Sequence, residues 1–135
     1  MHKERGVDAA RWVAALTAEL GYWAALTPGR RVTSLYFGGG TPSLAPISVI
    51  DGVIEAAGRR WGFADDAEIT LEANPADAER LAAFASAGVN RLSLGVQSFD
   101  DASLKFLGRD HSGAEARGAI ETALAAFPRV SADFI

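Results

Sequence analysis

Apolar side chains at helical spacing open the chain, and alternating strands and helices follow. Asp8 is a good N-cap residue, and the helix expected after it runs until residues 27–29, Thr-Pro-Gly, end it. One stripe of this helix contains Trp12, Val13, Leu16, Leu20 and Trp23. Because an amphipathic helix buries its apolar stripe, we expect both tryptophans to lie in the core.

A strand, a glycine turn and a helix form the next unit. The run over residues 32–37 predicts a short strand, and residues 38–40 supply a turn of three glycines. A helix from about Pro46 follows, and its apolar periodicity predicts burial of Ile50, Val53, Ile54 and Ala57.

The same alternation continues to the last residue of the sequence. The expected elements are a strand over 68–73, a helix carrying Leu81 and Phe84, a strand over 90–97, a short helix over 101–107, a second helix up to Pro128, and a strand from 129. Gly88 is the expected C′ glycine of the first of these helices. Ser112 and Glu115 form a capping box that opens the last one. Strands that alternate with helices favour right-handed βαβ units and a parallel sheet.

Side-chain parity divides the predicted strands into an apolar face and a polar face, because successive side chains point in opposite directions. The apolar parity contains Ile69, Leu71, Ala73, Leu92, Leu94, Val96, Val130, Ala132 and Phe134. The polar parity contains Glu68, Thr70, Glu72, Arg91, Ser93, Gln97, Ser131 and Asp133. A doubly wound sheet is covered on both faces and needs apolar residues on both. We therefore favour an α/β barrel with a polar interior over a doubly wound sheet, and simple edge-strand surface stays open as an alternative.

Composition excludes several classes of function. The 135 residues are 49% hydrophobic and 22% charged, which is typical of one globular domain. The net charge of −4 disfavours nucleic-acid binding, because no broad basic surface can form. No apolar run can span a membrane and no signal-peptide core follows residues 1–5, so we expect a cytoplasmic location. The sequence contains no cysteine, which excludes disulfides and thiolate metal sites within it.

Polar residues near the C-terminal ends of the predicted strands are the candidates for a site. Glycines at 38–40 let the backbone approach a ligand, although a purely structural turn explains them equally well. The turn lacks the lysine of a P-loop and the spacing of a dinucleotide motif, so phosphate binding is unsupported. Glu72, Gln97 and Asp133 share the polar parity, and their side chains would converge in a barrel.

Three other polar residues receive structural interpretations. Glu68 and Arg91 are expected to form an interior ion pair that shapes the cavity. His111 follows Arg109 in a predicted loop and has no partner at ligand spacing. We therefore expect His111 to be exposed to solvent and not to bind haem or a metal.

Four runs together resemble oxygen-independent coproporphyrinogen III oxidase and its relatives. They are YFGGGTPS at residues 36–43, EANP at 72–75, GVNRLSLGVQSF at 88–99 and LGR at 107–109. The resemblance covers nearly the whole chain. It implies that residues 1–135 form part of an open TIM-type barrel of the radical S-adenosylmethionine (radical SAM) kind. Such proteins bind a [4Fe–4S] cluster and S-adenosyl-L-methionine and generate a 5′-deoxyadenosyl radical.

The resemblance also assigns the parts of the cofactor to particular residues. The implied cofactor-binding residues are Gly39, Gly40, Thr41, Glu72, Gln97, Arg109 and Asp133. The glycine motif and the carboxylate of Glu72 would meet the methionine amino group, which as a cation needs acceptors. Arg109 would bind the methionine carboxylate, and Gln97 and Asp133 would contact the ribose hydroxyls. No catalytic residue is assigned.

For function, the resemblance implies oxidative decarboxylation of coproporphyrinogen III in haem biosynthesis, with a tetrapyrrole substrate and an electron donor as partners. The sequence departs from the oxidase pattern in two ways. The family's Cys-x-x-x-Cys-x-x-Cys loop is absent, so we expect the cluster only in a full-length protein and no radical chemistry from these residues alone. Residues 97–101 and 107–111 resemble the haem-chaperone relatives more closely. A haem chaperone without oxidase activity and a non-radical barrel that binds phosphate are the alternatives.

Overall fold

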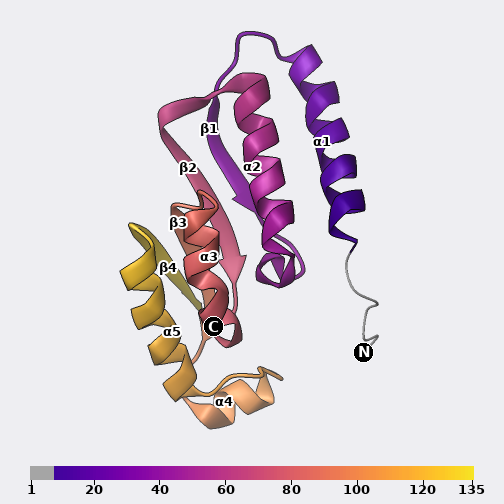
Figure 1. Cartoon of the computed structure of the whole chain (residues 1–135). Coiled ribbons are helices and arrows are strands. Elements are labelled where there is room, and N and C mark those ends of the chain that lie inside the picture. Colours follow the sequence, from indigo (N-terminus) through magenta and orange to yellow (C-terminus); the bar gives the residue numbers. More distant parts are fainter. Residues whose placement is uncertain (1–7) are drawn as a thin grey trace. The chain divides into compact units, whose positions relative to one another are not determined.

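The fold is known from a computed structural model that describes residues 8–135; the expectation about residues 1–5 lies outside this range. The elements are α1 (Ala9–Leu26), β1 (Val32–Phe37), the 3₁₀ helix η1 (Pro42–Leu44), α2 (Ile47–Trp61), β2 (Phe63–Ala73), the 3₁₀ helix η2 (Pro75–Arg80), α3 (Leu81–Ser86), β3 (Arg91–Gln97), α4 (Asp101–Phe106), α5 (Gly113–Ala126) and β4 (Arg129–Phe134). The strands form a four-stranded sheet in the order β1-β2-β3-β4 (Figure 1). The predicted order of strands and helices is therefore confirmed, although β2 begins at Phe63 and not at residue 68.

The chain divides into two compact units, and β2 passes from one into the other. The first unit contains the described residues up to Leu35 together with residues 45–67. The second unit contains residues 36–44 and 68–135.

In the first unit, α1 and α2 pack together where their residues are small. A Cβ atom added to Gly52 would lie 3.1 Å from Val13 Cγ1, so the glycine permits the close approach of the two helices. Asp8 caps α1 as predicted, accepting a hydrogen bond from the Arg11 N–H at 3.0 Å. The buried residues of α2 are Val49, Ile50, Val53, Ala56 and Ala57. Of the positions predicted to be buried, Ile54 is only half-buried.

The expectation that the tryptophans of α1 lie in the core is wrong. Trp12 is 54% exposed and Trp23 is 51% exposed, and α1 has no buried residue over its whole length. The indole N–H of Trp23 donates to Glu19 Oε1 at 2.7 Å on the surface. Within its unit α1 packs against α2, and this contact covers a narrower face than the apolar stripe.

In β2 and β3 of the second unit, the apolar parity is buried as predicted, but Thr70 and Ser93 of the polar parity are buried as well, and Phe134 of β4 is 54% exposed. Strands β2, β3 and β4 are parallel, and their register aligns Leu71 with Leu92 and Leu92 with Val130. Leu71, Leu92, Leu94 and Val96 are 0% exposed. Helices α3 and α5 contact each other in the second unit, and α5 also contacts β3 and β4 (Figure 1). The apolar face is therefore the core, and the polar face is left for a site.

Local signals in the second unit end and begin its helices as predicted. Gly88 follows the C-cap of α3 with φ of 106°, a conformation that favours glycine. The capping box of α5 is complete: Ser112 Oγ accepts from the Glu115 N–H at 3.2 Å, and Glu115 Oε2 accepts from the Ser112 N–H at 2.7 Å. Gly113 is tightly enclosed, since a Cβ atom there would lie 2.0 Å from the carbonyl oxygen of Phe99.

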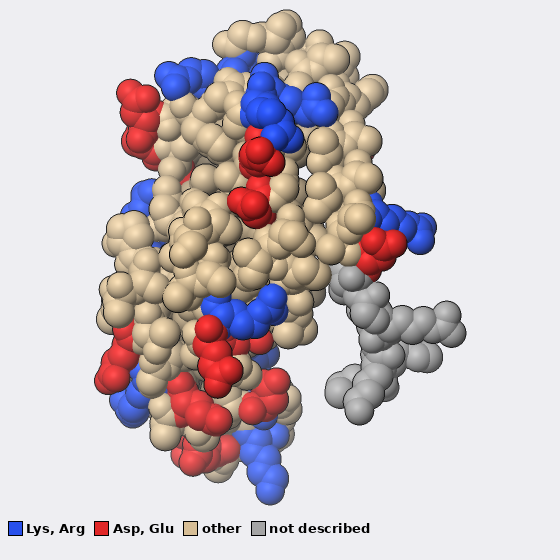
Figure 2. All heavy atoms as spheres, in the orientation of Figure 1, with Lys and Arg blue, Asp and Glu red and all other residues tan. Residues whose placement is uncertain are grey.

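The described residues include no helix that is both long enough and apolar enough to cross a membrane. On the face drawn in Figure 2, lysine and arginine side chains form small groups interspersed with acidic ones.

Candidate functional site

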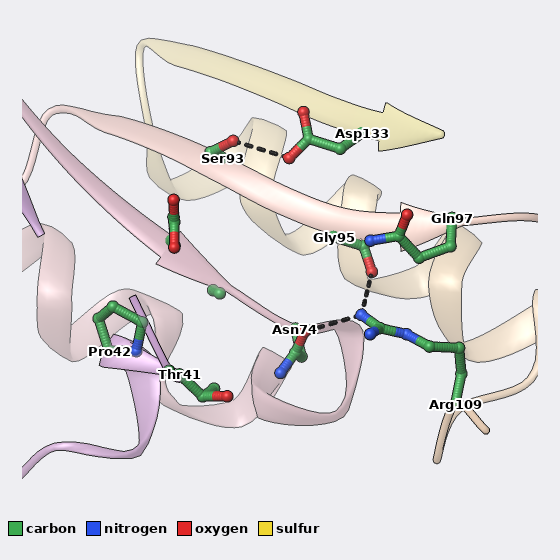
Figure 3. Close-up of a pocket in the computed structure, with 11 residues that line it drawn as sticks. Thr41, Pro42, Asn74, Ser93, Gly95, Gln97, Arg109 and Asp133 are labelled. Carbon is green, nitrogen blue, oxygen red and sulfur yellow. Dashed lines mark hydrogen bonds between the residues drawn. The ribbon is translucent and has the colours of Figure 1, made fainter. Parts of the chain in front are cut away.

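A polar cavity of about 290 Å³ lies in the second unit, on the polar face of its strands. Its lining comes from the ends of β2, β3 and β4, from the glycine turn and from the loop after α4 (Figure 3). The lining residues are Gly40, Thr41, Pro42, Glu72, Ala73, Asn74, Ser93, Gly95, Gln97, Arg109 and Asp133. All predicted site residues except Gly39 thus line one cavity. Gly39 is held beside it, because its N–H donates to Glu72 Oε2 at 3.1 Å.

Glu72 supplies the negative charge near the glycine turn. Its Oε1 accepts from the Tyr36 hydroxyl at 2.8 Å, and its Oε2 accepts from Gly39. The hydrogen bond to Glu72, followed by burial, raises the pKa of Tyr36, so the phenol keeps its proton and stays a donor. Each carboxylate oxygen has a second lone pair, which leaves Glu72 able to accept hydrogen bonds from a cation in the cavity.

Arg109 supplies the positive charge. Its Nη2 donates to Asn74 Oδ1 and to the carbonyl oxygen of Gly95, both at 3.1 Å (Figure 3). These contacts orient the guanidinium plane. Within residues 8–135, its buried Nε has no hydrogen-bond partner. A buried donor without a partner costs about 1–3 kcal/mol, more when charged, so the site favours a ligand that accepts from it.

Gly95 makes room for the polar groups beside it. An added Cβ atom would meet three side-chain atoms within 3.2–3.4 Å: Gln97 Nε2, Arg109 Nη2 and Asn74 Oδ1. A larger residue would push these groups apart. Gly95 is therefore part of the site, although it carries no side chain.

On the far side of the cavity, Asp133 accepts from the Ser93 hydroxyl at 3.0 Å. Arg91 and Glu68 form the predicted ion pair at 3.6 Å, although neither residue lines the cavity. Glu68 also contacts Arg129 at 3.1 Å, which has the same parity as Ser131 and Asp133. These contacts connect the polar faces of neighbouring strands.

The glycine turn is anchored to the segment that follows β2. Ser43 is completely buried, and its hydroxyl donates to Asp77 of η2. Arg80 Nη1 donates to the carbonyl oxygen of Ser43. Both contacts join residues far apart in the sequence, and they hold the turn against the end of β2, where Glu72 lies.

The expectation that His111 is exposed to solvent is wrong. The residue is only 5% exposed, and its Nε2 lies 3.0 Å from the carbonyl oxygen of Val96. The imidazole is enclosed because the short loop between α4 and α5 returns to the end of β3. Sequence analysis placed the residue in a loop correctly but could not show what that loop packs against.

Sequence reasoning also missed part of the lining. Asn74 lies in the EANP run and Ser93 on the polar parity, so both signals were present. Gly95 gave no chemical signal, since its contribution is the space that it leaves. Pro42 and Ala73 line the cavity without a polar side chain.

The charges of the cavity fit a zwitterionic ligand. Glu72 can receive an ammonium group, Arg109 a carboxylate, and Gln97 and Asp133 the hydroxyls of a diol. An iron–sulfur cluster is different. The chain contains no cysteine, and no group of three or more His, Cys, Asp or Glu residues in the described range could hold a metal ion. These residues therefore do not fit the cluster.

Comparisons with known proteins identify the family of the chain. The family model described as Radical SAM superfamily matches residues 16–135. Radical S-adenosyl methionine domain-containing protein 1, mitochondrial, of Bos taurus is 48% identical over 97% of this chain and 30% of its own length. Heme chaperone HemW of Haemophilus influenzae is 45% identical over 70% of this chain and 25% of its own length.

A solved structure supports the same assignment. Coproporphyrinogen III oxidase from Escherichia coli, described as a radical SAM enzyme, matches with a TM-score of 0.80 and 29% identity. The match covers 93% of this chain and 30% of that one, so the chain spans about a third or less of these relatives. The predicted α/β fold, part of an open barrel with a parallel sheet, is confirmed. The chain belongs to the radical SAM superfamily, among relatives that include heme chaperones and coproporphyrinogen III oxidase.

Proposed function

We propose that the cavity of the second unit binds S-adenosyl-L-methionine. The observation that carries this proposal is the pairing of opposite charges across one cavity. Glu72 lies at the glycine turn, and Arg109 presents a buried Nε that has no partner within the described chain. The methionine part of the cofactor has an ammonium and a carboxylate on one carbon, which would satisfy both.

The other predicted residues take the remaining groups of the cofactor. Gly39, Gly40 and Thr41 would approach the ammonium with their backbone, beside Glu72. Gln97 and Asp133 would bind the two ribose hydroxyls, an amide and a carboxylate being suited to a diol. The Ser93 hydroxyl, which donates to Asp133 at 3.0 Å, would hold that carboxylate in place.

The iron–sulfur cluster must have its ligands elsewhere in the natural protein. Residues 1–135 include no cysteine and span 30% of the Bos taurus relative, so we propose that they form part of a larger barrel domain. When bound beside such a cluster, S-adenosyl-L-methionine supplies radical chemistry. An electron donor for the cluster is then a further partner, and the 135 residues alone would be inactive.

For the biological role, we propose haem handling of the chaperone type, in the cytoplasm. Sequence identity does not separate the two roles, since the heme chaperone of Haemophilus influenzae is 45% identical over 70% of this chain and the oxygen-independent coproporphyrinogen III oxidase of Paracoccus denitrificans is 43% identical over 73%. The chaperone role is favoured by residues 97–101 and 107–111, which resemble the haem-chaperone relatives more closely. The second candidate is oxidative decarboxylation of coproporphyrinogen III, supported by the TM-score of 0.80 with the oxidase from Escherichia coli. The mitochondrial relative makes mitochondria the alternative location, which cell fractionation would decide.

Calorimetric titration of the complete natural protein with S-adenosyl-L-methionine tests the binding proposal. E72Q removes the negative charge, and R109K keeps the positive charge but loses the planar guanidinium that can bind a carboxylate through two hydrogen bonds, so each should weaken binding by about tenfold or more. E121Q and R59K, on exposed side chains of α5 and α2, are the matched controls and should bind like the wild type. Wild-type affinity in all four variants would refute the site.

The two biological roles are separated by two assays on the same protein. A haem chaperone should shift the haem absorption spectrum on titration and form no protoporphyrinogen from coproporphyrinogen III. An oxidase should form protoporphyrinogen in the presence of a reductant. Product formation without haem binding would overturn the chaperone proposal.

A further inference from the structure

The end of β3 has a strained backbone at a residue that faces the cavity. Gln97 has φ of 67°, and no other non-glycine residue in the described range has a positive φ. The Ser98 N–H donates to the Val96 carbonyl at 2.9 Å, which closes a γ-turn with Gln97 at its centre. A γ-turn with positive φ is rare and strained, and such strain persists only where surrounding contacts hold it.

The carbonyl oxygen that closes this turn has a second partner, the imidazole of His111. Nε2 lies 3.0 Å from the Val96 oxygen and must carry the proton, because a carbonyl oxygen only accepts. The His111 side chain is 0% exposed, and Asp110 Oδ1 lies 3.8 Å from Nδ1, beyond hydrogen-bond distance. Nδ1 has no hydrogen-bond partner among the described residues. The bond to Val96 is therefore the contact that ties this buried ring to its surroundings.

The turn determines where the Gln97 side chain lies. Leu94 pairs with Ala132 and Gln97 pairs with Phe134, so β3 has one extra residue between these pairs and the register shifts just before Gln97. The Gln97 amide then lies over Gly95, where an added Cβ would be 3.2 Å from Nε2. An extended backbone at this position would direct the side chain elsewhere, since side-chain direction follows the backbone dihedral angles.

We propose that His111 is a positioning residue for the cofactor site. By donating to Val96 it stabilises the strained turn that keeps the Gln97 amide in the cavity. His111 does not line the cavity, so it acts on a ligand through Gln97. This inference rests on the proposed binding of S-adenosyl-L-methionine.

The test measures the affinity of the complete natural protein for S-adenosyl-L-methionine by calorimetry. H111L removes the donor and keeps an apolar side chain, and it should raise Kd roughly three- to tenfold, the range expected for one lost hydrogen bond. H111Q should restore most of the affinity, because a glutamine amide nitrogen can occupy the position of Nε2. H111N should not, since its shorter amide occupies the position of Nδ1.

A double-mutant cycle shows whether His111 acts through Gln97. In the Q97A background, H111L should change Kd by less than about twofold, because the side chain that it positions is already gone. In the E72Q background, H111L should retain its full effect. A buried variant of the first unit, V53A on α2, controls for general loss of stability: it should lower Tm and leave Kd unchanged.

Several results would overturn the inference. They are wild-type affinity in folded H111L, equal weakness of H111Q and H111N, and full additivity of H111L with Q97A. If H111L does not fold, the comparison of H111Q with H111N gives the decision. If the wild type itself does not bind S-adenosyl-L-methionine, the proposed function fails first and this inference with it. If the wild type binds and H111L binds equally well, only the inference about His111 fails.

Discussion

Burial is distributed differently in the two units of the chain. The largest completely buried side chains, among them Phe84, Leu71 and Leu92, all belong to the second unit. In the first unit, the buried residues of the described chain all lie on α2, and α1 exposes its tryptophans. The cavity and its hydrogen bonds are in the second unit. A site that needs accurate placement of polar groups therefore coincides with the more densely packed region.

The largest expected effect is the loss of a core aromatic residue in the second unit. F84A removes a ring that is 0% exposed and should lower the free energy of unfolding by about 3–5 kcal/mol. F106A makes the same change at a residue that is 90% exposed and should have an effect below about 1 kcal/mol. Urea unfolding of both variants measures this difference. Equal effects would show that the Phe84 ring is not part of a closely packed core in the second unit.

Two glycines of one helix should respond to alanine in opposite directions. G113A places a Cβ 2.0 Å from the Phe99 carbonyl oxygen and should destabilise the protein by about 1–3 kcal/mol. Gly118 has no atom within 4 Å of an added Cβ, so G118A should stabilise by about 0.5–1 kcal/mol through helix propensity. Thermal unfolding of G113A and G118A measures both changes in stability. A neutral G113A would show that the start of α5 is not closely packed.

The capping box of α5 should make stability depend on pH. Hydrogen bonds from the Ser112 N–H and hydroxyl hold the pKa of Glu115 below its ordinary value of 4.5. A carboxyl whose pKa is lowered by folding stabilises the native state above its unfolded pKa, and this contribution is lost as pH falls through the folded pKa. The Tm of the wild type should therefore exceed that of E115Q at pH 7, and the gap should shrink towards pH 3.

The control for this prediction is S112A, which removes the hydroxyl partner. It should reduce the gap with E115Q at pH 7 and lower the free energy of unfolding by about 1 kcal/mol through the lost cap. A gap that is the same at both pH values would contradict the role of the charged carboxylate.

The smallest expected effect is at the exposed tryptophans of the first unit. W23A removes a side chain that is 51% exposed and should change the free energy of unfolding by less than about 1 kcal/mol. W12A, at a residue 54% exposed, should behave alike. Urea unfolding of the natural protein measures both. A loss above about 3 kcal/mol would mean that parts of the protein beyond these residues bury the rings.

Much of the second unit could be predicted from local patterns. The parity of β2 and β3 separated Leu71 and Leu92 from Glu72 and Ser93, because a strand turns each successive side chain to the other face. The end of α3 at Gly88 could also be predicted locally, because the backbone there has φ of 106°, a conformation that favours glycine. These signals need no knowledge of distant residues.

The rest depended on contacts between distant segments. Asn74 and Arg109 are far apart in the sequence, and their hydrogen bond exists because the loop after α4 returns to the ends of β2 and β3. No periodicity indicates that His111 returns to Val96, or that Gly95 leaves space for its neighbours. Conversely, the helical periodicity of residues 12–23 predicted that Trp23 is buried, but Trp23 is 51% exposed in the described structure.

For this protein, the sequence by itself determined the order of elements, the two faces of each strand, the helix caps and the candidate residues of the site. Those features follow from backbone geometry and side-chain chemistry within a few residues. Only the tertiary structure decided which faces are covered, which way the Arg109 guanidinium is held and why Gln97 keeps a strained backbone. Each of these depends on what packs against a residue, and packing partners come from distant parts of the chain.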